Sequence, residues 1–349
     1  MAMQTVIMAG GKGVRLRPLT QHCPKPLAPL CGEPVMGYTL QLLHRHGIHQ
    51  ANAALWYRPQ DVMREFRDGR HGVSLQYSIE DVPLGTAGSV RKAVNKKETT
   101  LVLSGDGLTG CDLTQALAFH RKSGAMATIV LSQIEDPRQY GVVFMRSDGR
   151  IEQFIEKPQW SAAVTSLVNT GIYLLEPEVF QLIPADEPYD FGRQLFPRMI
   201  QMNLPLYGYK SHEYWCDVGD PAAFLRAQGD LLRGRTGFVP ADMGLRTLKN
   251  GYISSDSYVS PSAQVAPDAM IEHSCVLSGA RVASGVRMHG SIICGGAAIE
   301  RGATLTEGSM LGAGVCLGAF TRCNGRRMPA HPDIAFEEKI GPAQAPSPA

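Results

Sequence analysis

The sequence lacks the features of a membrane protein and of a secreted one. No run approaches about eighteen uninterrupted apolar residues, and residues 1–11 contain neither a basic region nor a long apolar core. The eight cysteines form no CxxC pair, and no histidine cluster has zinc-ligand spacing, so free thiols in a reducing compartment are favoured over a zinc site. We therefore expect a cytoplasmic protein without a membrane partner.

A strong charge of either sign is also missing. The chain has 34 Lys and Arg residues against 32 Asp and Glu residues, a formal net charge of +2. This balance creates no global field for nucleic acid or a membrane surface, so nucleic acid is not an expected partner and any anion site must be local. The length of 349 residues exceeds that of a typical single core and predicts two domains.

Two common phosphate-binding patterns are absent from the most informative segment. The run GGKGVRLRPLT, residues 10–20, directly follows the apolar stretch Thr5–Ala9, so its glycines leave the end of a predicted strand, where backbone can approach a ligand. It contains no GxxxxGK(S/T), and Leu16 stands where GxGxxG requires a third glycine. Arg15 and, in the following PKPL, Lys25 place two cations beside backbone N–H groups, which suits a polyphosphate.

This run resembles the signature of the sugar-1-phosphate nucleotidylyltransferases, GGxGTRLxPLT followed by PKP. Val14 departs from that pattern because it replaces the usual Thr, which removes one hydroxyl contact but leaves backbone N–H contacts intact. The resemblance implies that Arg15 binds the leaving pyrophosphate and Lys25 the phosphates near the reacting centre. It also implies that the nucleotide is contacted by Ala9, Gly10, Gly11 and Gly13.

Residues 1–232 alternate short apolar runs with amphipathic stretches, the pattern of an α/β domain. Predicted strands are Thr5–Ala9, Ala51–Trp56, Val73–Ser78, Thr100–Ser104 and Ala127–Gln133. Predicted helices include Val35–His46 and Leu113–Lys122, and hairpins are expected around Gly141–Phe144, Ile151–Glu156 and Val168–Leu175. The expected fold is a Rossmann-like, mixed and mostly parallel sheet, which binds ligands beyond the carboxyl ends of its strands.

Two aspartates are candidate metal ligands. Asp106 ends the apolar run 101–106, where a carboxylate is well placed for a hard cation, although Gly-Asp-Gly is equally good turn chemistry. Asp217 precedes a helix predicted to start at Pro221; such a residue is usually a cap, but Asp220 is nearer the N-cap position. The family resemblance implies that Asp106 and Asp217 hold the catalytic Mg²⁺.

Further motifs occur in the order of the same family. LGTAG, residues 84–88, opens a predicted helix with small residues, and the resemblance implies that Gly85 and Thr86 contact the base; an ordinary helix start is the alternative. Glu156 and Lys157, in EKP, suit sugar hydroxyls and a phosphate, although EKP is also a common surface turn. The resemblance implies sugar-phosphate contacts from Tyr140, Gly141, Glu156, Lys157, Asn169 and Gly171.

The last third of the chain changes period. Aliphatic residues recur every six positions at Ile253, Val259, Val265, Ile271 and Leu277, and again at Ile293, Ile299, Leu305, Leu311 and Leu317. The two series are sixteen residues apart where they meet, which predicts one irregular coil or loop between Leu277 and Ile293. Because a six-residue repeat forms one side of a triangular coil, ten repeats predict a little over three coils.

This pattern resembles the short left-handed parallel β-helix that follows several nucleotidyltransferase domains. We expect a linker over 233–250, the β-helix over 251–320 and a tail over 321–349. Hexapeptide repeats also build acyltransferases, but His273 and His289 are better explained by packing or surface positions than by catalysis. The repeats are expected to organise a homo-oligomer.

The motifs together imply the reaction of a nucleoside triphosphate with a sugar 1-phosphate to give a nucleotide sugar and pyrophosphate, with Mg²⁺ as cofactor. LGTAG with PKPLAPLCGEPVMGYTL most resembles the mannose-1-phosphate guanylyltransferases, so GTP and mannose 1-phosphate are the expected substrates. One alternative is an enzyme for glucose 1-phosphate, or another hexose or heptose phosphate, that uses another triphosphate. The alternative of another class is a catalytically silent regulatory protein that binds nucleotide sugars.

Overall fold

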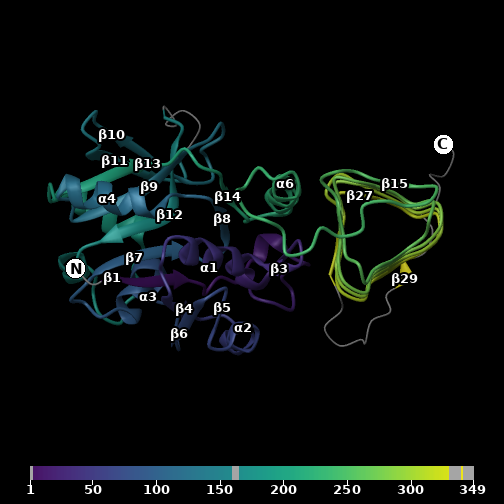
Figure 1. Cartoon of the computed structure of the whole chain (residues 1–349), viewed down its shortest axis with the longest axis horizontal. Coiled ribbons are helices and arrows are strands. Elements are labelled where there is room, and N and C mark those ends of the chain that lie inside the picture. The colour runs from purple at the N-terminus through teal and green to yellow at the C-terminus, as the bar shows by residue number, and fades with distance from the viewer. Residues whose placement is uncertain (1–2, 159–164, 330–338, 341–349) are drawn as a thin grey trace, which may run out of the picture. The chain divides into compact units, whose positions relative to one another are not determined.

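The computed structural model describes residues 3–158, 165–329 and 339–340, and the chain divides into two compact units (Figure 1). The first unit comprises Met1–Gly11 and Met36–Asp217, and the second comprises Lys12–Val35 and Val218–Ala349. The glycine-rich signature is therefore divided, because the chain leaves the first unit after Gly11. In the described part of the chain no helix has the length and apolar character needed to cross a membrane.

A mixed ten-stranded sheet forms the centre of the first unit. Its strands are β1 (Met3–Met8), β4 (Gln50–Leu55), β5 (Gly69–Arg70), β6 (Val73–Ile79), β7 (Thr99–Ser104), β9 (Ala127–Gln133), β10 (Gly141–Met145), β11 (Ile151–Glu156), β12 (Leu167–Leu175) and β13 (Leu206–Lys210). The main path runs β11-β10-β12-β7-β1-β4-β6-β5, and β9 pairs with β12 and β13. The β7-β1-β4-β6 part is parallel, whereas β10, β11 and β12 pair antiparallel.

The helices of this unit are α1 (Val35–Arg45), α2 (Pro59–Phe66), α3 (Gly85–Ala93), α4 (Leu113–Ser123) and α5 (Phe196–Gln201). Helix α4 shows why such segments start and stop: the Asp112 carboxylate accepts from the Gln115 N–H at 2.9 Å, and Gly124 ends the helix in the left-handed region at φ 60°. The strands and helices predicted from apolar periodicity are confirmed, with ends that differ by at most two residues.

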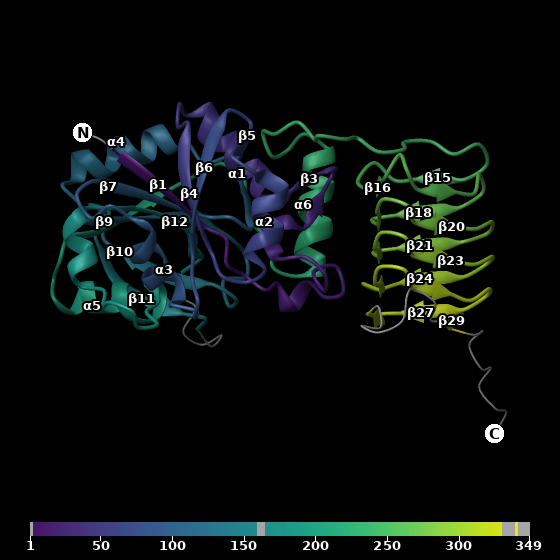
Figure 2. The ribbon, with the colours of Figure 1, turned by 90° about the horizontal axis from the view of Figure 1, so that it is seen from below.

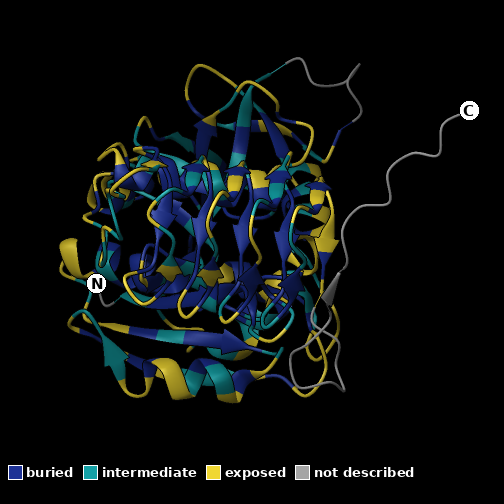
Figure 3. Ribbon diagram, turned by 90° about the vertical axis from the view of Figure 1, so that its right-hand side faces the viewer, coloured by how far each residue is buried: buried dark blue, intermediate teal, exposed yellow. Residues whose placement is uncertain are grey.

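The core of the first unit lies between the sheet and its helices. Phe191 and Phe196 are buried and pack against Tyr173 in tilted and edge-on arrangements, with ring centroids 4.6 and 5.1 Å away from that tyrosine. Figure 3 colours the chain by burial and shows buried strand segments joined by exposed turns. Burial of this aromatic cluster holds the antiparallel strands against α5, and those strands carry several predicted sugar-binding residues.

The second unit begins with residues 12–35 and continues with α6 (Pro221–Leu232). Pro221 opens α6 as predicted, and the Asp220 carboxylate caps it by accepting from the Ala223 N–H at 2.9 Å. Short elements complete the inventory: β2 (Pro29–Leu30), β3 (Glu33–Pro34) and the 3-10 turns Val14–Leu16 and Lys25–Leu27 in this unit, and β8 (Gly107–Thr109), β14 (Trp215–Asp217), Pro177–Gln181 and Phe191–Leu195 in the first.

Three five-stranded parallel sheets then form a solenoid that fits a left-handed β-helix. The first sheet contains β15 (Tyr252–Ile253), β18 (Met270–Glu272), β21 (Arg287–His289), β24 (Thr304–Thr306) and β27 (Arg322–Asn324). The second contains β16 (Tyr258–Val259), β19 (Cys275–Val276), β22 (Ile292–Ile293), β25 (Met310–Leu311) and β28 (Arg327–Met328). The third contains β17 (Gln264–Val265), β20 (Arg281–Val282), β23 (Ala298–Ile299), β26 (Cys316–Leu317) and β29 (Lys339–Ile340). Figure 1 shows the triangular cross-section of this solenoid, and Figure 2 shows its stacked strands from the side.

The predicted irregular coil between Leu277 and Ile293 is wrong. Val259 pairs with Val276 and Val276 with Ile293, so the inward position is Val276 and the coil continues without interruption. Periodicity missed this because two sides, from Ile271 to Val276 and from Met288 to Ile293, are five residues long. Coil lengths differ accordingly, and these small differences are absorbed at the corners.

The predicted end of the β-helix at residue 320 is also wrong. Strands β27 and β28 continue the stack within the segment expected to be a tail, and β29 pairs with β26. Five coils are present where a little over three were predicted. Cys323 and Met328 occupy inward positions of the fifth coil, and neither belongs to the Val, Ile and Leu residues that define the six-residue period.

Candidate active site

A cavity of about 280 Å³ lies at the carboxyl ends of the parallel strands of the first unit. Met8, Ala54 and Ser104, from the ends of β1, β4 and β7, contribute to its wall. Of the residues predicted from sequence, it is lined by Gly10, Gly11, Gly85, Thr86 and Asp106. The prediction that a ligand site would form at this edge of the sheet therefore coincides with a real cavity.

The LGTAG loop closes one side of this cavity and forms the start of α3. The Glu80 carboxylate accepts from the Leu84 N–H at 2.9 Å and from the Ser89 hydroxyl. The Tyr189 carbonyl accepts from the N–H groups of Ala87, at 2.8 Å, and Gly88, at 3.0 Å. The first turn of α3 is thus held from two directions before any ligand arrives.

Gly85 cannot carry a side chain at this position. Its φ of +69° favours glycine, and an added Cβ would lie 2.8 Å from the Tyr189 carbonyl oxygen and 2.9 Å from Asp190 Oδ2. The neighbouring Thr86 hydroxyl donates to Asp190 Oδ1 at 3.3 Å and accepts from the Phe191 N–H at 3.0 Å. These contacts bring Asp190 into the cavity wall from the segment before the short π-helix 191–195.

The two predicted metal ligands lie next to each other. Strands β8 and β14 pair antiparallel with Asp217 opposite Gly107, so Asp217 lies beside the residue that follows Asp106. The Ser104 hydroxyl donates to Asp106 Oδ1 at 2.5 Å, which fixes that carboxylate at the cavity. Two residues 111 positions apart in sequence are thus joined by one short ladder.

The donor set suits a hard divalent cation whose remaining ligands come from elsewhere. Among the described residues no group of three or more His, Cys, Asp or Glu side chains could hold a metal ion. Magnesium is commonly bound through one or two carboxylates, with waters and substrate phosphates completing its octahedron. Asp106 and Asp217 match that kind of site, in which metal and substrate bind together.

A second cluster joins the predicted sugar-binding residues. Gly141 pairs with Glu156 across β10 and β11, and the Lys157 N–H donates to the Tyr140 carbonyl at 3.0 Å. An added Cβ at Gly141 would lie 2.4 Å from Phe154 Cζ, so only glycine fits beneath that ring. Lys157 itself has a φ of 48°, an uncommon conformation for a non-glycine residue, and such outliers concentrate at functional sites.

The Asn-Thr-Gly segment connects this cluster to the cavity. Asn169 Oδ1 accepts from the Gly171 N–H at 3.0 Å within an irregularity of β12. An added Cβ at Gly171 would lie 3.1 Å from Ser104 Cβ, so this turn packs against the strand end that carries Asp106. The Trp215 indole donates to the Thr170 carbonyl at 3.2 Å, and its ring lies 5.2 Å from that of Tyr140.

The charge state of Glu156 is perturbed by its surroundings. Burial raises the pKa of its carboxyl group, and the positive charges of Lys157 and Arg193 partly oppose that effect. Gly192 also approaches this carboxylate, since an added Cβ there would lie 2.8 Å from Glu156 Oε2. A partly buried carboxylate with nearby cations is suited to accept hydrogen bonds from sugar hydroxyls.

Of the other predicted residues, Gly13, Arg15 and Lys25 belong to the second unit, whereas Ala9 is buried in the first and does not line the cavity. Gly13 adopts φ +64°, and its carbonyl accepts from the Leu16 N–H at 2.9 Å and from the Thr20 hydroxyl at 2.6 Å. An added Cβ at Gly13 would lie 3.0 Å from Lys25 Cβ. The loop is thus folded tightly over the aliphatic part of Lys25, which is only 8% exposed.

Sequence reasoning missed two carboxylates of the cavity, Glu80 and Asp190. Glu80 directly follows β6, so the strand-end reasoning that selected Asp106 would also have found it. Asp190 carries no comparable signal because it reaches the cavity through a contact with Thr86, 104 residues away in sequence. Both residues add acceptor oxygen atoms to the cavity wall that carries Gly85 and Thr86.

Comparison with known proteins agrees with this geometry. A family model described as nucleotidyl transferase matches residues 4–234. A UTP–glucose-1-phosphate uridylyltransferase from Synechocystis sp. is 39% identical over 233 residues, covering 62% of this chain and 60% of that protein. A mannose-1-phosphate guanylyltransferase from Mycobacterium tuberculosis is 36% identical over 236 residues, covering 66% of this chain and 65% of that protein.

A solved structure supports the fold of the same region. It is that of a candidate glucose-1-phosphate thymidylyltransferase from Bacillus anthracis, with a TM-score of 0.58 and 24% identity, covering 65% of this chain and 94% of that one. This likeness concerns the fold alone. The chain spans less than two thirds of the length of the two curated relatives above. Because the family model matches well over half of its residues, the chain belongs to the nucleotidyl transferase family.

Proposed function

We propose that this chain transfers a nucleotidyl group from a nucleoside triphosphate to a sugar 1-phosphate. An oxygen of the sugar phosphate forms a bond to the α-phosphorus while the bond from that phosphorus to the β-phosphate oxygen breaks, which releases pyrophosphate. No covalent enzyme intermediate is required, so the protein contributes by positioning the reactants and neutralising charge.

The observation that carries this proposal is the pairing of β8 with β14. It brings Asp217 opposite Gly107, the residue after Asp106, and Asp106 lines a cavity to which the LGTAG loop also contributes. When bound there, Mg²⁺ would supply Lewis-acid polarisation of the α-phosphate and neutralise phosphate charge. The protein's own contribution is to hold the two carboxylates in a fixed relation before the substrates bind.

Three cations have separate roles in the proposal. Arg15 binds the leaving pyrophosphate, and Lys25 binds phosphates near the reacting centre. Lys157 binds the phosphate of the incoming sugar, next to Glu156, which accepts hydrogen bonds from sugar hydroxyls. The tight turn at Gly13 and the burial of Lys25 support the first two roles, because a restrained cation loses little entropy when it binds a phosphate.

We propose GTP as the nucleotide and mannose 1-phosphate as the sugar. The cavity wall that holds Gly85 and Thr86 also presents Glu80 and Asp190, and carboxylates accept hydrogen bonds without donating them. Guanine offers adjacent N–H donors on one edge, whereas uracil offers a single N–H flanked by carbonyls. Acceptor-rich lining therefore favours guanine, and several relatives are named as mannose-1-phosphate guanylyltransferases.

Two other candidates remain open. The Synechocystis relative is named as a uridylyltransferase for glucose 1-phosphate, so UTP with glucose 1-phosphate is the second choice of substrates. A catalytically silent regulator of the same family would bind nucleotide sugars without releasing pyrophosphate. The presence of Arg15, Lys25, Asp106 and Asp217 favours an enzyme over a silent regulator.

The test is release of pyrophosphate by the full chain with Mg²⁺, assayed over a matrix of four triphosphates and several sugar 1-phosphates. We expect the highest kcat/KM for GTP with mannose 1-phosphate. A maximum with another pair would overturn the assigned specificity but retain the reaction. Binding of nucleotide sugars without pyrophosphate release from any pair would contradict the enzyme and favour the regulator. Homo-oligomer formation remains a prediction that sedimentation would test.

A further inference from the structure

One outward face of the solenoid is apolar and buried. In the second sheet of the solenoid, Val259 and its stacked counterparts point into the core, so their strand neighbours point outward. Those outward residues are Tyr258, Cys275, Ile292 and Met310, exposed by only 3, 1, 0 and 0%. The other two sheets are not covered along their whole length: Tyr252 of the first is 47% exposed, and in the third Gln264 and Arg281 are exposed although Ala298 and Cys316 are buried.

Within the second unit, part of this cover comes from the segment that carries the phosphate loop, residues 12–35. The Asp242 N–H donates to the Cys31 carbonyl at 3.0 Å, and the Asp242 carboxylate accepts from the Tyr258 hydroxyl at 2.9 Å. An added Cβ at Gly32 would lie 2.8 Å from Asp242 Cβ, so the two segments are in close contact. Residues 31–32 are thereby tied to the first coil of the apolar face.

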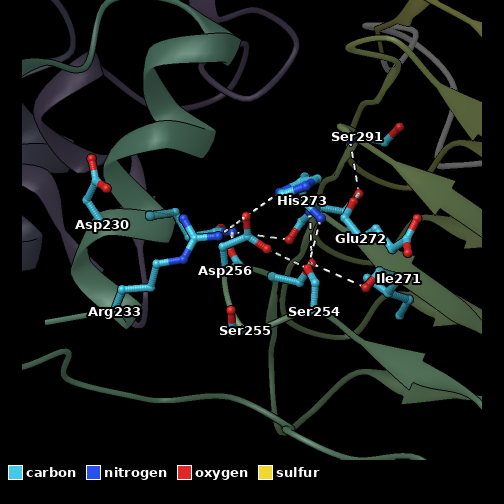
Figure 4. Close-up of polar contacts among 12 residues, drawn as sticks. Asp230, Arg233, Ser254, Ser255, Asp256, Ile271, Glu272, His273 and Ser291 are labelled. Atoms are coloured by element: carbon cyan, nitrogen blue, oxygen red, sulfur yellow. Dashed lines mark hydrogen bonds and ion pairs between the residues drawn. The ribbon is translucent and has the colours of Figure 1, made fainter. Parts of the chain in front are cut away.

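Helix α6 contacts the solenoid at its first two coils (Figure 4). The buried Gln228 amide donates to the carbonyls of Asp256, at 3.0 Å, and Ser274, at 3.1 Å. Arg233, just after α6, donates to the Asp256 carboxylate at 2.7 Å, and His273 contacts the same carboxylate. Gln228 and Arg233 thus join α6 and its carboxyl end to the first two coils, while His273 links the second coil to the same buried Asp256.

The far end of the face holds the phosphate loop directly. Arg327 is the outward residue of β28 in the fifth coil, in the position that Met310 occupies one coil earlier. Its guanidinium donates from Nη1 to the carbonyl oxygen of Arg15 at 2.9 Å. This contact joins residues 312 positions apart in sequence and involves the backbone of the residue proposed to bind pyrophosphate.

We propose that, within the second unit, the apolar face of the solenoid seats residues 12–35 and Arg327 is a positioning residue that fixes the Arg15 segment of the phosphate loop. This inference rests on the proposed role of that loop in binding the triphosphate. A guanidinium bound to a backbone carbonyl forms a charge-assisted hydrogen bond, and it restrains the loop without occupying the side chain of Arg15. Restraint before binding lowers the entropy lost when the triphosphate is bound.

The role differs from the expectation that the repeats only organise subunits. A pure assembly module would present its apolar surface to another copy of the chain. Here the buried face lies in one compact unit with residues 12–35 and is tied to them at Cys31 and at Arg15. We expect this face to be covered in the same way in a monomer and in an oligomer, because the contacts that cover it are within one chain.

The experiment uses three full-length variants. Arg327→Ala removes the contact, and Arg327→Lys retains a cationic donor. Arg322→Ala is the matched control, because Arg322 lies in the same coil, is exposed and points outward from the first sheet. One readout is the rate at which trypsin cleaves after Lys12 and Arg15 without nucleotide, followed by mass spectrometry. The other is kcat and KM for GTP in the pyrophosphate assay, or for the best triphosphate of the panel.

In Arg327→Ala we expect faster cleavage after Arg15 and a kcat/KM for the triphosphate lowered about three- to tenfold. Arg327→Lys should restore part of both effects, and Arg322→Ala should match the wild-type chain. Wild-type cleavage and kinetics in Arg327→Ala would overturn the proposal, as would equal effects in Arg322→Ala. Arg15→Ala in the same assays separates the two proposals. If it leaves both constants unchanged, the loop's role fails while cleavage still reports on Arg327.

Discussion

Asp217 lies opposite Gly107 in the antiparallel ladder of β14 and β8, and Gly107 is the residue that directly follows Asp106. This ladder has only two strands, so its geometry depends on the elements that flank it. Asp106 lies in the two-residue turn between β7 and β8, and Asp217 is the last residue of β14. Each carboxylate is therefore placed directly at the end of a strand.

Replacing either carboxylate should remove the proposed metal site. We expect Asp106→Asn and Asp217→Asn each to lower kcat by at least about 10²-fold, the scale of losing one preorganised electrostatic group. Titration of each variant with Mg²⁺ in the pyrophosphate assay provides the measurement. Asp148→Asn is the control, because Asp148 is exposed in the hairpin and accepts from the Arg150 N–H, which Asn can also do. Full Mg²⁺-dependent turnover in both cavity variants would rule out the assignment.

The phosphate loop makes a kinetic prediction. Arg15→Ala should lower kcat more than it raises KM for the triphosphate, because charge builds up on the departing pyrophosphate mainly in the transition state. Steady-state kinetics at saturating sugar 1-phosphate would measure both constants. A change confined to KM would instead identify Arg15 as a residue that binds substrate and transition state equally.

The backbone conformation of Gly85 leads to a prediction for which Gly124 is the control. Gly85 and Gly124 both adopt left-handed backbone, at φ +69° and +60°, but an added Cβ meets the Tyr189 carbonyl at 2.8 Å only at Gly85; nothing lies within 4 Å at Gly124. Gly124→Ala should therefore cost about 1–2 kcal/mol of unfolding free energy from backbone strain alone. Gly85→Ala should cost more and should also raise KM for the triphosphate. Urea unfolding and kinetics of both variants provide the comparison, and equal results for the two would contradict the contact.

Glu156 makes a prediction about pH. Because burial raises its folded-state pKa, the carboxyl group favours folding when protonated, so its contribution is fully present below the unfolded pKa and is lost as pH rises through the folded value. The unfolding free energy of Glu156→Gln minus that of the wild-type chain should therefore increase as pH rises from about 4 toward 7. Urea unfolding across that range measures the difference.

The same substitution should weaken sugar binding. Near pH 7 the Glu156→Gln variant should therefore have both a higher unfolding free energy and a higher KM for the sugar 1-phosphate than the wild-type chain. Glu152→Gln removes a charge from the same strand, where the carboxylate is half exposed and pairs with Arg146. It serves as the control for charge removal. A pH dependence in Glu156→Gln that parallels the wild-type curve would show that the buried carboxyl group is not responsible.

The first unit was largely predictable because its signals are local. The run 127–133 is apolar throughout and forms a strand with the predicted ends, while LGTAG opens α3 as expected. Such segments need only their own residues to specify their structure. Asp190 was not predictable in this way, since its position depends on contacts with Thr86 and Gly85 that the sequence brings near only after folding.

The solenoid illustrates a different limit. Its repeat was evident, but its phase was not, because Val276 and Leu277 are adjacent aliphatics and a strict period of six selects the wrong one. Only the pairing of Val276 with Val259 and Ile293 decides which side chain enters the core. Likewise, no periodic pattern could predict that one outward face would be covered, because that depends on where residues 12–35 fold back.

The number of coils determines the length of that covered face of the solenoid. Four strand spacings of about 4.8 Å separate Tyr258 in the first coil from Arg327 in the fifth, a span of about 19 Å. Stacked repeats are stable at many lengths, so folding alone does not fix the number of coils. A version of this chain with one coil deleted would remain a solenoid, yet its terminal guanidinium would stop short of Arg15 by one strand spacing. In the proposed arrangement, a change in the number of coils would therefore require another residue to make the contact with the Arg15 carbonyl.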